Sequence, residues 1–558
     1  MPNSAQGNTT PLHGLDLESR QMVLDTIGQL RKKLLTKENI LEWDKEEKFP
    51  EDAIRQMLSP DIGLQLFFIP EEYGGMGGGA RDCCAVTREI CKICLGVGTA
   101  FFAIQLGADP LIVGGTDAQK QRWLGAIAEG KTLVAYAVTE PNAGSNLAAL
   151  TTKAEPITDA EGKVTAYRIN GSKQFISTGG YADYVTLLAV APEGPTFFVV
   201  EKTAPGFVRG KGEEKHGIRA SNTSPLSFTD VVVPVENLIG GIPGQGLKQA
   251  NKVFGYTRLM VAAMALGAGE SALAIAITYA KERVQFGTTL SEKQGYTHKL
   301  IVPHAVRLEA AAAYIEETAE RIDGGDLDLQ VEGSIAKLFT SESANRTADD
   351  AMQALGGYGY IREFEVEKIK RDAKITCIYE GTSEVQQSII STFRWKTTVK
   401  SKGGYYGAIA DRLRALDQEV PETAARFYAW AASALNDAIL LVHRHKLSKE
   451  QHLMFALADM MAHVEVGAAL AHKAARAKSA GSADAERLLT ASRIFAAEVA
   501  RFVNDKALII LLGTGTVDSA VISEFLSKMA HAHLAGAVTH TVRDMDRMAD
   551  ILFGRASS

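Results

Sequence analysis

The strongest constraint on the fold is a change of hydrophobic period that occurs twice along the chain. From about residue 15 to 133 apolar residues recur with helical spacing, as in Met22, Val23, Ile27, Leu30 and Leu34. From 134 to about 235 the pattern changes to short β-branched runs between turns, and after about residue 246 the helical period returns. The predicted strands are Val134–Val138, Val164–Ile169, Tyr184–Ala189, Phe197–Val200 and Leu226–Val233. This order predicts a multidomain α+β protein rather than one repeated unit.

The predicted domain boundaries follow from these changes of period. Residues 1–14 are expected to be a disordered lead-in, 15–133 a helical domain, 134–245 a β domain, and 246–400 a second helical domain. A Gly-rich break at 401–404 leads into a helical extension, 401–558, with a single proline. Shifting the chain by about 157 residues places 512–516 beside 355–360, so the extension is either a degenerate copy of the preceding domain or a coincidental match.

Composition excludes some classes of protein. The 558 residues are 46% hydrophobic with a net charge of -6, so we expect a globular protein without a nucleic-acid footprint. No apolar run reaches the ~18 residues of a membrane span, and the N-terminus lacks a signal or transit pattern. These features predict a cytoplasmic, prokaryotic-like protein, with peripheral membrane association left open.

The cysteines and histidines offer little support for redox or metal chemistry. The five cysteines include the pair Cys91 and Cys94 in the predicted helical stretch 88–95, which we interpret as buried thiols. His443 with His445, and His531 with His533, are spaced by two residues, so on a helix each pair points to different faces. We therefore expect no metal site.

Several motifs occur in a specific order along the chain. The first is 136–146 (YAVTEPNAGSN), a strand that runs into a loop of small residues able to bring backbone amides close to a ligand. It is followed by 170–177 (NGSKQFIS), 217–223 (GIRASNT), 282–287 (ERVQFG), 353–359 (QALGGYG) and 371–384 (RDAKITCIYEGTSE). Together these motifs closely resemble the acyl-CoA dehydrogenase family, over about residues 20–395.

The resemblance implies a fold and a cofactor. The expected architecture is an N-terminal helical domain, a central small β-barrel, a C-terminal four-helix bundle and, as in the very-long-chain branch of the family, an extra helical domain. FAD is expected between the β domain and the second helical domain, reaching a neighbouring subunit. The resemblance assigns the flavin to Tyr136, Val138, Thr139, Gly144, Ser145, Phe175 and Ser177. It assigns the dinucleotide of a partner subunit to Arg283, Phe286, Gln294, Gln353, Gly356 and Gly357, and the region near the adenine to Thr382 and Glu384.

The predicted catalytic base is Glu380. Removal of a proton beside a thioester needs a base strengthened by desolvation, and an apolar setting around Ile378–Gly381 is expected to raise the pKa of this carboxylate. Some relatives place the base immediately before Arg258, but Thr257 stands there in this chain. By resemblance Ser145, Arg258, Glu380 and Gly381 contact the acyl-CoA, with a backbone amide of Glu380 binding the thioester carbonyl.

The implied function is desaturation of an acyl-CoA to the trans-2-enoyl-CoA, as in fatty acid β-oxidation, with electrons passed to electron-transferring flavoprotein. Alternatives are an acyl-CoA oxidase, an enoyl-CoA reductase or a scaffold protein of the same fold. In 96–105, the segment aligned with the floor of the acyl pocket, glycines argue for a deep pocket while Phe101 and Phe102 argue for a short one. We expect medium to long saturated chains, with branched or cyclic groups open, and a homodimer in preference to a tetramer.

Overall fold

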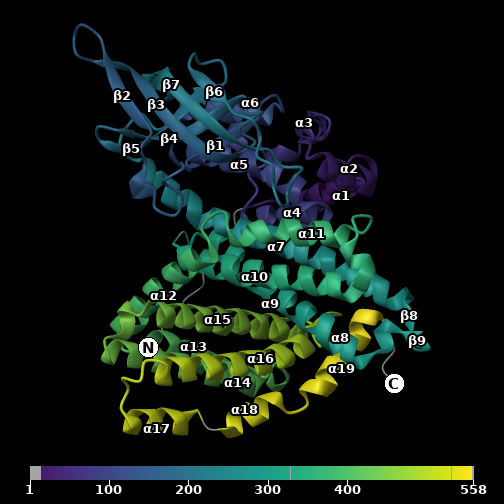
Figure 1. Ribbon diagram of the computed structural model, residues 1–558. Coiled ribbons are helices and arrows are strands. Elements are labelled where there is room, and N and C mark those ends of the chain that lie inside the picture. Colours follow the sequence, from purple (N-terminus) through teal and green to yellow (C-terminus); the bar gives the residue numbers. More distant parts are fainter. Residues whose placement is uncertain (1–13, 327, 530, 556–558) are drawn as a thin grey trace, which may run out of the picture. The chain divides into compact units, whose positions relative to one another are not determined.

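The computed structural model describes residues 14–326, 328–529 and 531–555, which form two compact units (Figure 1). Unit 1 contains the residues up to 260 together with 316–330, and unit 2 contains 261–315 and the residues from 331 onward. Of the predicted lead-in, only Gly14 lies within the described residues. The predicted order of helical, β and helical domains followed by a helical extension is confirmed.

Unit 1 begins with six helices. They are α1 (Leu17–Lys33), α2 (Lys37–Glu46), α3 (Glu51–Leu58), α4 (Ala80–Ile93), α5 (Leu95–Gly114) and α6 (Asp117–Ala128). Hydroxyl side chains cap two of them: Thr36 accepts from the third residue of α2, and Thr116 forms a reciprocal capping box with Gln119. Helix α5 is buried over nearly its whole length, so it forms the centre of this domain.

The CxxC pair lies at a helix junction and not inside one helix. Helix α4 ends at Ile93, and Cys94 has an extended backbone (φ −160°) before α5 begins. The predicted continuous helix over 88–95 is therefore wrong, because the chain turns at Cys94. All five cysteines are free and buried, and burial raises the pKa of Cys83 to about 12. Burial also raises the pKa of Cys84 and of Cys377, so these three thiols are protonated at neutral pH.

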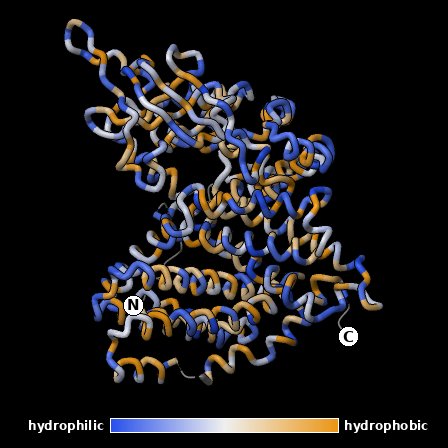
Figure 2. Tube along the Cα trace, viewed as in Figure 1, coloured by the Kyte–Doolittle hydropathy of each residue, from blue (hydrophilic) through white to orange (hydrophobic). Residues whose placement is uncertain are grey.

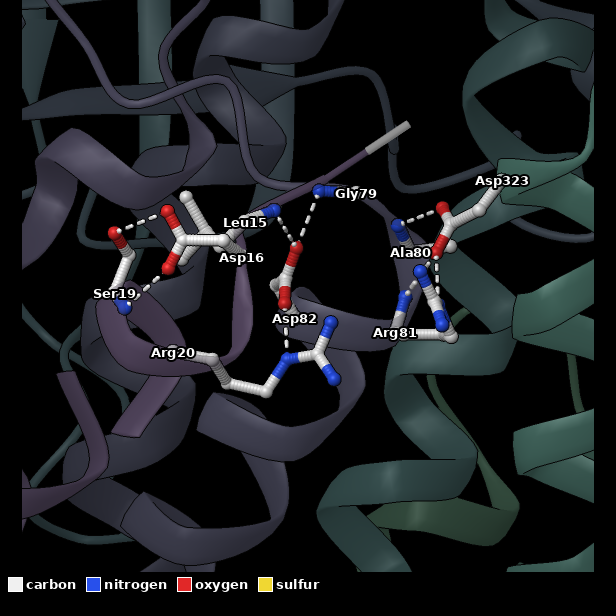
Figure 3. Close-up of polar contacts among 9 residues, drawn as sticks. All are labelled: Leu15, Asp16, Ser19, Arg20, Gly79, Ala80, Arg81, Asp82 and Asp323. Carbon is white, nitrogen blue, oxygen red and sulfur yellow. Dashed lines mark hydrogen bonds and ion pairs between the residues drawn. The ribbon is translucent and has the colours of Figure 1, made fainter. Parts of the chain in front are cut away.

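A buried aspartate ties the N-terminal segment to the start of α4 (Figure 3). Asp82 Oδ2 accepts from the backbone amides of Leu15 (2.8 Å) and Gly79 (2.9 Å), while its Oδ1 pairs with Arg20 Nε at 2.5 Å. The Asp82 side chain is fully buried. Because the carboxylate is satisfied on both oxygens, the chain before α1 is fixed against the glycine-rich loop that precedes α4.

Asp323, at the end of α9, caps the same helix from a distant part of the sequence (Figure 3). Its carboxylate accepts from the amides of Ala80 (2.5 Å) and Arg81 (3.2 Å) and from Arg81 Nε (2.9 Å). A carboxylate at a helix N-terminus meets unpaired amides and the positive end of the helix dipole. This contact explains why residues 316–330 belong to unit 1.

The β domain is one seven-stranded sheet in the order β1-β4-β2-β3-β7-β6, with β5 paired to β4. The strands are β1 (Val134–Ala137), β2 (Lys153–Thr158), β3 (Val164–Ser177), β4 (Tyr184–Ala191), β5 (Gly194–Glu201), β6 (Phe207–Arg209) and β7 (Thr223–Pro234). β1 and β4 are parallel, whereas β3 is antiparallel to both β2 and β7. The alternate residues of these strands enclose a core that includes Ile169, Leu187, Phe198 and Val231. Strands β2 and β6 were not predicted.

Unit 2 contains the second helical domain. Its main helices are α7 (Gly246–Glu282, which begins in unit 1), α9 (Val302–Asp323, which ends in unit 1), α10 (Gln330–Leu355, whose first residue belongs to unit 1) and α12 (Ser383–Lys400). Between them lie the hairpin β8 (Val284–Gln285) and β9 (Thr288–Thr289), α8 (Gln294–Leu300) and α11 (Glu365–Ala373). Gly269 permits close helix packing, because a Cβ there would lie 2.9 Å from Leu308 Cδ2.

The extension adds α13 (Gly404–Glu419), α14 (Ala425–Arg444), α15 (Gln451–Ser479), α16 (Ala485–Leu512), α17 (Ser519–Lys528), α18 (His531–Val538) and α19 (Thr541–Phe553). Helices α15 and α16 lie side by side, and Figure 2 shows hydrophobic residues recurring along both. α15 also packs on α12. Moved by 157 residues, α10 would span 487–512, and α16 spans 485–512.

A buried charged network joins the extension to the bundle. Arg394 of α12 forms two hydrogen bonds to Glu465 of α15 (2.9 and 3.0 Å) and an ion pair with Glu332 of α10 (3.0 Å). Glu465 also accepts from the hydroxyls of Tyr406 (2.8 Å) and Tyr314 (3.3 Å). Every one of these side chains is buried. Removing one of them would leave a buried partner without its hydrogen bond or counter-ion, so the network stabilises the junction only when all its members are present.

Helices α5, α7 and α15 are long and apolar enough to cross a membrane by length and composition, which differs from the sequence prediction. However, 72–83% of each apolar window is buried within the protein, as expected for core helices. Among the described residues, no group of three His, Cys, Asp or Glu side chains is arranged to hold a metal ion; the side chain of His531 lies outside that set.

Candidate active site

The loop after β1 is locked by a buried ion pair. Lys173 of β3 donates to Glu140 Oε1 (2.8 Å) and to the carbonyl of Val138 (2.9 Å), and both charged side chains are at most 1% exposed. Glu140 also accepts from Thr151, through its amide and hydroxyl (2.7 Å each), and from the amide of Thr152 (3.1 Å). The predicted flavin residues Val138 and Thr139 therefore lie on a rigid backbone.

The electrostatics of this pair follow from its hydrogen bonds. Burial alone raises the pKa of Glu140, but hydrogen bonds from Lys173 and Thr152 outweigh burial and bring that pKa down to about 2. Burial lowers the pKa of Lys173 to about 8, against the opposing effect of Glu140. At neutral pH both groups are charged, and each is the principal partner of the other.

An aromatic side chain on β3 is presented outward by a strained backbone. Phe175 is 62% exposed and has φ 59°, and Thr178, just past the end of the strand, has φ 61°. The pairing of β3 with β7 shifts register between Lys173 and Ile176, so a bulge creates this presentation. Left-handed conformations cost non-glycine residues about 1–2 kcal/mol and gather at functional sites. Ser177, the last residue of β3, is half-buried.

The remaining residues of unit 1 that were predicted to bind ligands differ in how exposed they are. Gly144 and Ser145 are exposed on the loop after β1, and a Cβ on Gly144 would meet no atom within 4 Å. Arg258 of α7 is 9% exposed, and its guanidinium lies 5.9 Å from the ring of Phe254. Tyr136 is half-buried, with its ring 5.8 Å from that of Phe197. Open backbone and an exposed ring are what a flat heterocycle with polar edges requires.

In unit 2, Glu380 occupies a short loop between a turn of 3₁₀ helix (Lys374–Cys377) and α12. Glu380 has φ 53° and Gly381 has φ 89°, so two consecutive residues are left-handed. Gln386 Nε2 donates to the carbonyls of both Glu380 and Gly381 (3.0 Å each), and Lys337 Nζ donates to the Gly381 carbonyl (2.6 Å). Thr382 then caps α12. The half-buried Glu380 side chain is thus carried by a defined backbone.

The residues predicted to bind a partner subunit's dinucleotide gather on unit 2. All six are exposed: Arg283, Phe286, Gln294, Gln353, Gly356 and Gly357. Phe286, at the tip of the β8–β9 hairpin, is 96% exposed with φ 53°. The Arg283 guanidinium lies 6.0 Å from the ring of Tyr358, and Tyr296 of α8 donates to the carbonyl of Ala354 (3.1 Å). These contacts join the elements that carry the six residues.

The extension contacts one of these residues. Gln294 donates to Asp546 of α19 (2.9 Å), and His298 of α8 lies 3.1 Å from the same carboxylate. Arg555 donates to the carbonyl of Ser291 at 2.8 Å. The C-terminal helix therefore supports α8, an involvement that the sequence did not predict.

The segment 96–105, which the resemblance predicts to form the floor of an acyl pocket, lies in α5. A Cβ on Gly98 would come within 2.3 Å of Cys91 Sγ, and one on Gly96 within 3.3 Å of the Ala220 Cβ, so both glycines serve close packing. Phe101 is fully buried and Phe102 nearly so. Their rings pack on each other and on those of Phe67 and Phe68, with centroid distances of 5.2–6.4 Å. The glycines therefore do not enlarge a cavity.

Comparisons with known proteins agree with this arrangement. The chain matches the models of the acyl-CoA dehydrogenase N-terminal domain (18–131), middle domain (135–231) and C-terminal domain (244–393). It is 40% identical to an acyl-CoA dehydrogenase of Bacillus subtilis, covering 67% of this chain and 96% of the relative. It is 36% identical to the solved butyryl-CoA dehydrogenase of Megasphaera elsdenii, with a TM-score of 0.64 over 68% of this chain and 98% of that one.

A third comparison covers the extension. The structure of an acyl-CoA dehydrogenase complexed with FAD from Bacillus anthracis has a TM-score of 0.83, covering 97% of this chain and 96% of that one, at 23% identity. This likeness shows that the fold, extension included, occurs in another protein. The order of helical and β domains, with the residues described above, defines an oxidoreductase of the acyl-CoA-desaturating class. The chain belongs to the acyl-CoA dehydrogenase family, whose members are FAD-dependent.

The residues present fit FAD. The exposed ring of Phe175 and the open loop at Gly144 suit an isoalloxazine, and the exposed Arg283 suits a pyrophosphate because its charge is permanent and its fork bidentate. Sequence reasoning missed three polar residues that hold the loops: Lys173, Lys337 and Gln386. Their only sequence signal is a lone polar side chain within an otherwise apolar or motif-bearing run, as with Lys337 in 335–339 (IAKLF).

Proposed function

We propose that this protein desaturates a short-chain acyl-CoA between its α and β carbons, with Glu380 as the base. The observation that carries the proposal is the loop of Glu380, where a left-handed backbone is held by hydrogen bonds from Lys337 and Gln386. Such a costly backbone persists at a position where the direction of a side chain matters. Glu380 takes the α proton onto its carboxylate.

FAD, held by the residues around Phe175 and Gly144, would supply the acceptor for the hydride that leaves the β carbon. Within unit 1, the Glu140–Lys173 pair keeps the Val138–Thr139 backbone in place, so its amides and carbonyls need no rearrangement when a ligand binds. Phe175 provides an apolar surface for the ring, and Ser177 a hydroxyl. In unit 2, the exposed surface around Arg283 and Phe286 would contact the adenosine half of FAD held by a second copy of this chain.

The short-chain assignment departs from the expectation of medium to long chains. It is supported by the glycines of α5, which face Cys91 and Ala220 rather than a cavity, and by the packing of Phe101 and Phe102 among aromatic neighbours. It also agrees with the butyryl-CoA dehydrogenase named among the similar structures. The proposed electron acceptor is electron-transferring flavoprotein, as the family membership suggests.

An acyl-CoA series tests this proposal. The purified holoenzyme is mixed anaerobically with straight-chain substrates from butyryl- to palmitoyl-CoA, and the loss of flavin absorbance is followed. The fastest reduction is expected with butyryl- or hexanoyl-CoA, and reoxidation should be fast with electron-transferring flavoprotein and slow with oxygen. Fastest reduction by palmitoyl-CoA would overturn the chain length, and rapid peroxide formation in air would identify an oxidase.

A further inference from the structure

Lys337 is a buried cation directly behind the predicted base loop. It lies on α10 between Ala336 and Leu338 and is fully buried. Its ammonium donates to the carbonyl of Gly381 at 2.6 Å. Taking an ammonium out of water is costly unless it makes strong hydrogen bonds, so a lysine at this position is retained for what it binds.

The charge of Lys337 acts on both sides of the loop. Burial raises the pKa of Cys377, three residues before Glu380, to about 11, and the Lys337 charge opposes that rise. The pKa of Glu384, four residues after Glu380, is lowered chiefly by its own backbone amide and by Thr382, with a further contribution from Lys337. Lys374 acts on both groups in the same direction, so two lysines place positive charge beside this loop, and Lys337 is the one that also donates to its backbone.

Gln386 completes the contact from the first turn of α12. Its side-chain amide is fully buried and donates to the carbonyls of Glu380 and Gly381. A Cβ on Gly381 would lie 2.6 Å from Gln386 Nε2, so the glycine is needed for this close approach as well as for its φ of 89°. Two side chains from two helices therefore make three hydrogen bonds to two consecutive carbonyls.

These hydrogen bonds oppose a strained backbone. Glu380 is a non-glycine residue at φ 53°, a conformation that relaxes unless the surroundings over-determine it. Removing Gln386 takes the shared donor from the carbonyls of Glu380 and Gly381, and removing Lys337 takes the second donor from the Gly381 carbonyl. Either loss weakens the hold on the backbone that directs the Glu380 side chain. Proton transfer is sensitive to displacement of that side chain, since the base must lie within hydrogen-bond reach of the proton it removes.

We propose that Lys337 and Gln386 are positioning residues for Glu380, forming a clamp on the Glu380 and Gly381 carbonyls that aims the base at the substrate α carbon. The inference rests on the proposed function, because it assumes that Glu380 is the base. Lys337 lies on α10, and Gln353 is the one predicted site residue that this helix carries. The proposal therefore gives a role in catalysis to a buried lysine that the motifs did not include.

Proton abstraction can be measured without any hydride transfer. In an acyl-CoA analogue in which sulfur replaces the β methylene, no β hydrogen exists, so the only reaction is loss of the α proton to Glu380 and its return from solvent. In D₂O the holoenzyme should introduce deuterium at the α carbon, measured by mass spectrometry. We expect Lys337→Met and Gln386→Leu each to slow this exchange by on the order of 100-fold.

A second readout follows the loop itself. Amide hydrogen exchange of the peptides covering 374–387 should become faster in both variants. The matched control is Lys368→Met, which removes another buried lysine of unit 2, one that pairs with Asp372 at 2.6 Å; it should leave α-carbon exchange within about threefold of wild type. Gln386→Leu keeps the test decisive if Lys337→Met does not fold.

The outcomes separate this inference from the proposed function. If wild type exchanges deuterium and Glu380→Gln does not, the base is assigned; variants of Lys337 or Gln386 that then exchange at the wild-type rate would refute the clamp. If wild type fails to exchange, the proposed function itself fails. Slow exchange in Lys337→Met, with Lys368→Met like wild type and faster amide exchange at 374–387, supports the clamp.

Discussion

Replacing Lys173 by methionine removes the cation of the buried pair in the β domain while keeping much of its volume. Glu140 then retains the two amides and the hydroxyl of Thr151 and Thr152, all within 3.1 Å, but loses its counter-ion in a site where the side chain is 1% exposed. Breaking a buried pair from one side costs about 3–5 kcal/mol. Because three donors remain, we expect the lower end, about 3 kcal/mol of unfolding free energy.

A matched control is available in the same unit. Lys202 pairs with Asp183 at 2.7 Å, but its side chain is 45% exposed, so Lys202→Met should cost less than about 1 kcal/mol. Both variants are compared with wild type by urea unfolding followed by circular dichroism, and by titration of the apoprotein with FAD. Lys173→Met should also bind FAD more weakly, because the variant lacks the ammonium that donates to the Val138 carbonyl.

The result for Lys173→Met would refute the reasoning if the variant unfolds within about 1 kcal/mol of wild type and binds FAD equally tightly. In that case the pair would be a replaceable core contact. Loss of stability with unchanged FAD affinity would show that the loop is held by other contacts.

Three further predictions follow. Hydrogen bonds bring the pKa of Glu140 from an ordinary 4.5 to about 2, so this carboxylate contributes about 3 kcal/mol to the free energy of unfolding above pH 5. That contribution is lost as the pH falls towards 2, and Glu140→Gln should therefore flatten this part of the curve of unfolding free energy against pH. Glu465→Gln, which leaves Arg394 without its bidentate partner, should cost about 3 kcal/mol and make the extension more sensitive to limited proteolysis. Gly98→Ala should lower thermal stability by about 1–3 kcal/mol, and Cys91→Ala should restore part of the loss because the added methyl meets the Cys91 sulfur.

The sequence predicted the elements with a strong period well and missed those without one. Strand β4 carries a continuous apolar pattern, and its predicted bounds, Tyr184–Ala189, agree closely with the observed Tyr184–Ala191. Strand β2 has one buried residue among six and contains Pro156, and β6 has three residues, so neither shows an alternation. Their pairing with β3 and β7 is decided by tertiary contacts that a local pattern does not encode.

The site divides in the same way. The motifs predict ligand-binding roles for Glu380 and for the residues around Arg283, which the structure shows half-buried and exposed respectively. The backbone that presents them was not predictable: the left-handed Phe175 follows from a register shift, and the clamp on the Glu380 loop joins Lys337 to Gln386 across two helices. Such contacts depend on packing between segments far apart in the sequence.

The most direct test of the central claim, that Glu380 is the base, is the anaerobic rate of flavin reduction by butyryl-CoA in Glu380→Gln. The amide is close in size but cannot accept the α proton, so the variant should stay yellow, bind the acyl-CoA and reduce its flavin at least 100-fold more slowly than wild type. Reduction within tenfold of the wild-type rate would contradict the account, because the proton would then be leaving to another group.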